Sequence, residues 1–167
     1  MIGHEISHGF DDRGRQFDSQ GRNRNWWSDA TDDRFVSKAD ALIEQYDRYC
    51  PWAGTCVNGL GTLGENIGDL AGLEISYAAW KLSLGGKTAP VIDGLTGDQR
   101  FFLAYARSYR GKMREELTRA MLEGDDHAPN RYRVNGVVRN MDAWYSAFGI
   151  KPGDKLYLPP EERVRLW

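Results

Sequence analysis

The sequence predicts a mainly α-helical fold with little β-structure. Apolar residues recur at helical spacing in several segments, and Gly or Pro marks the segment ends. Only residues 131–140 suggest a short strand. The chain has 167 residues, of which 41% are hydrophobic and 28% charged. That composition can bury a core and argues against disorder, so residues 1–167 form one domain or a piece of a larger one.

The charge balance excludes two classes of partner. Lys and Arg total 22 against 24 Asp and Glu, which gives a net charge of -2. Nucleic acids and anionic membranes attract a basic surface, which this balance does not indicate. No apolar run approaches the roughly 20 residues of a spanning helix, and no signal-peptide pattern is visible. We therefore expect no nucleic acid partner and no membrane segment within this chain.

The first half of the chain predicts two long helices. Residues 1–10 have the pattern of a helix end, and the polar residues 11–25 that of a loop. Ser28 is a candidate N-cap for a helix over 29–49, which Pro51 ends. Its predicted buried face consists of Ala39, Leu42, Ile43 and Tyr46.

The next predicted helix begins at the candidate N-cap Thr62, continues to Leu84 and ends at Gly85-Gly86. Its apolar stripe consists of Leu63, Ile67, Leu70, Leu73, Tyr77 and Trp80. A third helix fits 97–110, with Phe101, Phe102, Tyr105 and Tyr109 facing a core. Shorter helices are predicted over 112–122 and 142–148, on either side of the possible strand.

The two cysteines, Cys50 and Cys56, flank a turn. They are close enough in sequence to form a disulfide in an oxidising compartment, and they can equally be two reduced thiols. The sequence leaves both alternatives open.

The most informative motif is His4-Glu5-Ile6-Ser7-His8, which matches H-E-x-x-H. Residues i and i+4 lie on one face of a helix, so both imidazoles can bind one zinc ion. Glu5 is then placed to take a proton from a zinc-activated water, as a general base. The alternative interpretation is a chance match in an ordinary helix.

Catalytic zinc needs a third protein ligand, and Glu65 is the candidate. Glu65 and Asp69 also lie at i and i+4, so Glu65 can bind zinc while Asp69 accepts a hydrogen bond from a zinc histidine. Asp11 can serve the other histidine. Spacing alone equally fits a solvated acidic helix face.

GHEISHGFDD followed by NGLGTLGENIGDLAGL resembles the neprilysin-like (M13) zinc metallopeptidases, gluzincins related in active-site design to thermolysin. FFLAYARSYR, DDHAPNRYRVNG and the ending GDKLYLPPEERVRLW extend the resemblance over essentially all of the chain. It implies a thermolysin-like helical lobe with one zinc ion per chain and peptides as substrates.

The resemblance also implies a role for each matching residue. His4, His8 and Glu65 bind zinc, while Asp11 and Asp69 orient the histidines. Glu5 polarises the water and shuttles its proton. His127 stabilises the oxyanion of the tetrahedral intermediate. Arg133 binds a substrate carbonyl. Without the resemblance, His127 and Arg133 would be interpreted as a loop histidine and a surface charge.

Several features depart from the family pattern. The upstream Asn-Ala-aromatic strand that binds substrate backbone and the capping helical domain are absent. Gly68 stands where Ala is usual, at a helix cost of about 1 kcal/mol. Val164 stands where the animal ectoenzymes have a Cys, which favours a bacterial-type member. We expect residues 1–167 to be the C-terminal part of a catalytic domain, truncated on its N-terminal side.

Three hypotheses follow. The first is a zinc endopeptidase acting on oligopeptides, in an extracytoplasmic compartment rather than the cytoplasm. The second is a zinc-binding but catalytically incomplete fragment, which lacks the N-terminal part of the same protein. The third, a helical interaction domain without metal, must treat all of the matching motif segments as coincidence.

Overall fold

The structure is a computed structural model that describes residues 1–167 and is mainly helical, as predicted. Strand-like pairing is confined to three isolated bridges, Phe17–Asn23, Trp52–Thr55 and Ile92–Leu95. None of the helices is long and apolar enough to cross a membrane. The α-helices are α1 (Ile2–Ser7), α2 (Asp29–Asp47), α3 (Leu63–Ser83), α4 (Gly97–Ser108), α5 (Glu115–Gly124), α6 (Asn130–Val138) and α7 (Asp142–Phe148). Short 3-10 turns are η1 (His8–Phe10), η2 (Gly14–Gln16) and η3 (Pro160–Glu162).

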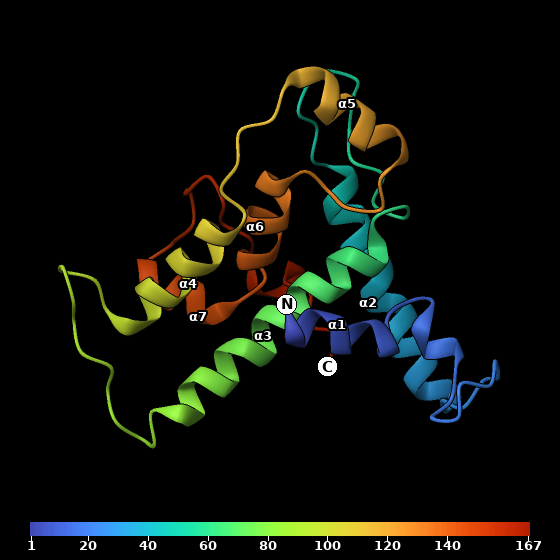
Figure 1. Ribbon diagram of the computed structural model, residues 1–167, viewed down its shortest axis with the longest axis horizontal. Helices are drawn as coiled ribbons and strands as arrows, with labels where there is room; N and C mark the ends of the chain where they lie inside the picture. The colour runs from blue at the N-terminus through green and yellow to red at the C-terminus, as the bar shows by residue number, and fades with distance from the viewer.

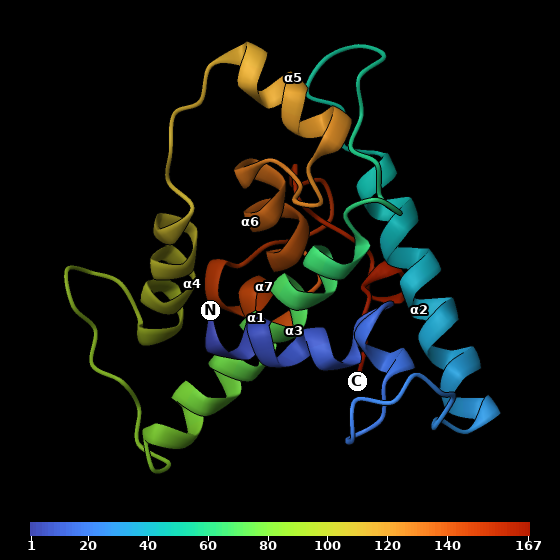
Figure 2. The ribbon, with the colours of Figure 1, turned by 45° about the vertical axis from the view of Figure 1, so that its right-hand side comes forward.

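Helix α3 runs through the middle of the molecule, and the other helices are arranged around it (Figure 1). α1 crosses it on one face, α2 lies on one side, and α4, α6 and α7 lie on the other (Figures 1 and 2). The fully buried side chains of Ile67 and Leu70 place α3 in the core, together with Leu42 and Tyr46 of α2 and Val137 of α6. Burial of these apolar side chains supplies the main driving force for the fold.

α1 packs against α3 with almost no side-chain material between the two backbones. A Cβ atom built on Gly72 would lie 2.7 Å from the backbone N of His4, and one on Gly68 would lie 2.9 Å from the His4 ring. Glycine at position 68 carries a small cost in helix propensity, but its lack of a side chain makes room for the imidazole of His4. This close crossing holds in place α1, which carries His4 and leads directly into His8.

Helices α2 and α3 largely follow the sequence prediction. α2 begins after Ser28, whose side chain accepts a hydrogen bond from the Thr31 N–H, and it ends at Asp47, two residues before the predicted end. α3 ends as predicted before Gly85 and Gly86, which both have positive φ angles. Thr62 is the N-cap residue of α3, as predicted, but its side chain makes no capping hydrogen bond, because its hydroxyl donates to the Asn58 carbonyl instead.

The predicted strand in 131–140 is wrong, since this segment forms α6. Its first turn closes on Pro129, whose carbonyl accepts from the Tyr132 N–H at 2.7 Å. Tyr132 then stacks on Tyr49, just after the end of α2, with ring centroids 4.9 Å apart, and Gly136 lies against the hydroxyl of Tyr46. Packing against α2 thus overrides the local alternation of polar and apolar residues that suggested a strand.

Smaller differences concern α4 and α5. α4 ends at Ser108, two residues early, and begins with a capping box between Thr96 and Gln99. α5 spans Glu115–Gly124 rather than 112–122. α7 has the predicted bounds. Cys50 and Cys56, which the sequence left open, form a disulfide.

The tight crossing predicts that Gly72→Ala destabilises the chain. The new methyl group meets the α1 backbone, and overpacking of this kind costs about 1–3 kcal/mol, against a helix-propensity gain of about 1 kcal/mol. Urea unfolding should show a lower midpoint. Gly9→Ala is the control, because a Cβ there has nothing within 4 Å. Equal or higher stability of Gly72→Ala would contradict the crossing.

Glu74 on α3 gives the protein a pH-dependent stability. Burial raises its pKa from 4.5 to about 7, opposed in part by the charge of Arg165. Because the folded state favours the neutral carboxyl, the free energy of unfolding is highest below the unfolded pKa and falls as pH rises to about 7. Glu74→Gln should remove this fall between pH 4.5 and 7, whereas the exposed Glu44→Gln should retain it. Denaturant titrations at several pH values check this, and identical pH profiles for all three proteins would refute it.

Candidate metal centre

The two histidines of the H-E-x-x-H motif face one another at the end of α1. His4 lies within α1 and His8 begins η1, one helical turn later. Their Nε2 atoms are 3.2 Å apart, as the i, i+4 spacing predicts. The His4 side chain is 11% exposed and that of His8 31%, so the pair is accessible mainly from the His8 side.

Glu65 in the first turn of α3 completes a triangle with these nitrogens. Its Oε2 lies 3.2 Å from Nε2 of His4, and its Oε1 lies 3.4 Å from Nε2 of His8. A tetrahedral zinc ion with ligand bonds of 2.0–2.1 Å separates its ligand atoms by about 3.3 Å. The distance between the two nitrogens and the distance from each nitrogen to the nearer carboxylate oxygen of Glu65 all match that spacing, so the residues present fit a zinc ion.

Each histidine is oriented from behind by a buried carboxylate. Asp69 Oδ1 lies 2.9 Å from Nδ1 of His4, and Asp11 Oδ2 lies 2.8 Å from Nδ1 of His8. Carboxylates only accept hydrogen bonds, so each Nδ1 holds the proton and each Nε2 presents a lone pair. The centre of the triangle is therefore surrounded by acceptors, an arrangement that suits a cation.

Asp69 links His4 to Arg133, because it interacts with both side chains. Arg133 on α6 donates to both of its oxygens, from Nε at 2.6 Å and from Nη2 at 2.8 Å, and the Tyr109 hydroxyl donates at 2.9 Å. Burial raises the pKa of Asp69, but the hydrogen bonds from Arg133 and His4 outweigh it and leave the pKa below its ordinary value. The hydrogen bond to Asp69 raises the pKa of His4 despite burial. The site thus holds a stable carboxylate behind His4.

His127 approaches the same triangle from the segment between α5 and α6. Its Nε2 lies 2.9 Å from Oε2 of Glu65, and its Nδ1 lies 2.8 Å from Oδ1 of Asp125 and 3.0 Å from Oδ1 of Asp126. Although His127 is close, no donor is aligned to hydrogen-bond the buried Oε2 of Glu65. The geometry leaves that oxygen free to bind a cation.

The structure therefore brings together the histidines, carboxylates and arginine that the sequence singled out. Glu5 differs, because its side chain is exposed next to His4 on α1. Sequence reasoning missed Asp125 and assigned Tyr109 only to the core. The position of Asp125 two residues before His127 was the available signal, whereas nothing local linked Tyr109 to Asp69.

A cavity of about 220 Å³ opens beside the metal centre. His4 and Asp69 form one wall, and its apolar and aromatic lining includes Leu73, Phe101, Ala104, Tyr105 and Tyr109. The cavity is therefore large enough for one apolar side chain next to the triangle.

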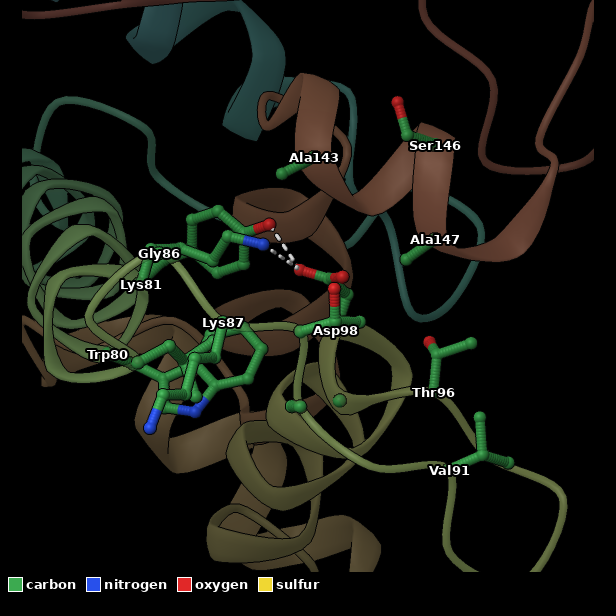
Figure 3. Close-up of a pocket in the computed structure, with 15 residues that line it drawn as sticks. Trp80, Lys81, Gly86, Lys87, Val91, Thr96, Asp98, Ala143, Ser146 and Ala147 are labelled. Atoms are coloured by element: carbon green, nitrogen blue, oxygen red, sulfur yellow. Dashed lines mark hydrogen bonds and ion pairs between the residues drawn. The ribbon is translucent and has the colours of Figure 1, made fainter.

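A larger cavity, of about 650 Å³, lies at the far end of α3 (Figure 3). Trp80 on its wall is about 22 Å along the helix axis from Glu65. Lys81 and Asp98 point toward one another within it, with Nζ and Oδ1 3.4 Å apart. None of the candidate site residues lines this cavity, so it is not part of the metal centre.

Comparison with known proteins decides the family. The family model "Peptidase family M13" matches residues 1–164. The chain belongs to peptidase family M13. Human "Membrane metallo-endopeptidase-like 1" is 39% identical over 174 residues, and "Neprilysin-2" of Caenorhabditis elegans is 39% identical over 171. All of this chain matches in both cases, over 22% and 23% of the two relatives.

Two solved structures share the fold. The zinc metalloprotease ZMP1 of Mycobacterium tuberculosis, in complex with an inhibitor, has a TM-score of 0.96 and 49% identity over 99% of this chain and 26% of that chain. PEPO of Lactobacillus rhamnosis has a TM-score of 0.82 and 40% identity over 98% of this chain and 24% of that chain. The chain thus spans about a quarter of the length of these proteins.

Asp69→Asn tests the link at the centre of the site. The amide keeps the shape but removes the charge, and it cannot accept from His4 and Arg133 on both of its outer atoms. Loss of such a partner typically lowers metal affinity about 10- to 100-fold. Competition with a zinc-binding dye measures the affinity. Asp98→Asn, in the distant cavity, is the matched control, and equal zinc affinity of the two variants would contradict the assigned role.

Proposed function

We propose that this chain carries the zinc-binding catalytic centre of a metallopeptidase that hydrolyses oligopeptides. The proposal rests on one observation, the triangle of donor atoms from His4, His8 and Glu65 with edges of 3.2–3.4 Å. Membership of family M13 supports zinc as the ion. A zinc ion bound to these three residues supplies Lewis acidity and lowers the pKa of a coordinated water toward 7.

Glu5 acts as the general base in this proposal. It follows the ligand His4 directly on α1, and its exposed carboxylate is not committed to a partner in the core. It accepts the proton of the attacking water and passes it to the leaving amine. General acid–base catalysis of this kind contributes about 10²- to 10⁴-fold to the rate.

His127 and Arg133 stabilise charge on the substrate. Asp125 and Asp126 lie near Nδ1 of His127 and orient its ring, so that an Nε2–H can donate to the developing oxyanion. Arg133 is fixed by Asp69 through Nε and Nη2, so its remaining nitrogen, Nη1, can donate to a substrate carbonyl. Both groups are positioned before substrate arrives, which lowers the cost of reorganisation during reaction.

The cavity beside His4 and Asp69 suits an apolar substrate side chain. Leu73, Phe101 and Tyr105 supply apolar surface in the same cavity that the proposed ligand His4 lines. An apolar residue next to the scissile bond would bury its side chain there and hold the peptide in register. We therefore propose peptides with such a residue as substrates.

A second candidate function is zinc binding without turnover by this chain alone. This candidate is favoured by the share of the related proteins that the chain covers, which is 22% of the human relative and 26% of the ZMP1 chain. Substrate contacts from further residues of a longer protein would then be required. We also propose an extracytoplasmic location, which the Cys50–Cys56 disulfide and the relative named a membrane metallo-endopeptidase support.

Glu5→Gln separates catalysis from metal binding. The amide cannot take a proton, so we expect kcat to fall about 10²- to 10⁴-fold while one zinc ion per chain is retained. Elemental analysis measures zinc, and a fluorogenic peptide measures turnover. Glu44→Gln on α2 is the control. Full activity of Glu5→Gln would refute the general base, and zinc binding without turnover in the parent chain would support the second function.

A further inference from the structure

Helix α5 is weakly attached to the rest of the fold, although it leads directly to His127. None of its residues is fully buried, and it is not among the helices that pack closely on α3, α4 or α7. Leu122 provides its apolar contact with the core. The helix ends at Gly124, and the next residue, Asp125, hydrogen-bonds both the backbone N–H and Nδ1 of His127. The position of α5 therefore influences where the His127 ring lies.

A second contact holds α5 against the loop between α2 and α3. The guanidinium of Arg119 on α5 lies 4.2 Å from the centre of the Trp52 ring, within the range of a cation–π interaction. Glu115, one turn earlier, fixes this guanidinium by accepting from Nη2 at 2.7 Å. Both ribbon views show the loop beside α5, at the end of the molecule away from α7 (Figures 1 and 2).

The loop that carries Trp52 is closed by the Cys50–Cys56 disulfide. Within it, the Thr55 N–H donates to the Trp52 carbonyl at 3.1 Å, and just beyond it the Val57 N–H donates to the Tyr49 carbonyl at 2.9 Å. A closed ring of seven residues has few conformations, so the disulfide limits where the Trp52 side chain can lie. Both cysteines are exposed, and a reductant can therefore reach the bond.

We propose that the disulfide-closed loop 50–56 is a positioning element for His127, which acts through Trp52, Arg119 and α5. Reduction of the disulfide releases the loop and thereby loosens α5 and His127. The proposal rests on the proposed function only for its effect on turnover. Its effect on the order of α5 stands on the contacts alone.

The chemical step is thiol–disulfide exchange with a dithiol. One thiolate of the dithiol attacks a sulfur of the Cys50–Cys56 bond and forms a mixed disulfide. The second thiol then displaces that sulfur, so the dithiol is oxidised to a disulfide and the two cysteines become thiols. Two electrons and two protons pass from the dithiol to the protein.

The experiment compares the zinc-loaded oxidised protein, the same protein after dithiothreitol, Cys50→Ser/Cys56→Ser, and Trp52→Ala. Hydrogen exchange of residues 115–127 is the first readout. We expect this exchange to be about fivefold faster in the reduced protein and in both variants than in the oxidised protein. Loss of a cation–π pair of about 1 kcal/mol corresponds to that factor. Trp52→Phe keeps an aromatic face and should restore slow exchange. Lys81→Met, which removes a cation near Trp80 on the distant cavity, is the control.

Peptide turnover is the second readout. In an active parent protein we expect kcat to fall by a similar factor with KM little changed and one zinc ion retained, because the ligands lie outside the loop. Unchanged exchange after reduction would overturn the proposal, and so would faster exchange without a fall in kcat in an active parent. An inactive parent would instead contradict the proposed catalytic function, while exchange would still test whether the loop holds α5.

Discussion

The crossing of α1 and α3 is the constraint on which the metal centre depends. Glycines recur every fourth residue along α3, at Gly64, Gly68 and Gly72, and α1 and the residues after it lie directly over them. Side chains at these positions would separate the helices by the width of a methyl group or more. His4 and His8 would then move away from Glu65, and the donor triangle would no longer have the size of a zinc ion.

The same crossing determines the electrostatics of the site. Because the helices approach so closely, Asp69 is 3% exposed and Asp11 5%, so each carboxylate is removed from water. Buried charges are costly unless they are paired, and here His4 and Arg133 pair with Asp69 while His8 pairs with Asp11. The negative charge behind the histidines therefore stabilises a cation in front of them. The close crossing of α1 and α3 therefore determines both the packing of these helices and the charge around the candidate metal centre.

Local signals predicted much of the fold. Helical spacing and end residues located α2, α3 and α7 to within two residues, because in these helices the buried stripe and the breaking residues agree. They failed for α6, where Arg131 to Val134 alternates like a strand but Tyr132 and Gly136 pack against α2. The role of the glycines on α3 was also missed. Their spacing was visible, but a close crossing exists only when a partner helix is present.

The sequence by itself singled out the candidate metal ligands. H-E-x-x-H and the Glu65–Asp69 pair are each short enough to lie on one helix face, so spacing alone oriented their side chains. Only the tertiary structure decided that Glu65 meets the histidines, that Arg133 and Tyr109 share Asp69, and that Trp52 of the disulfide loop contacts Arg119 of α5. These contacts join residues that are distant along the chain. Their distances depend on how the helices pack, which no local pattern specifies.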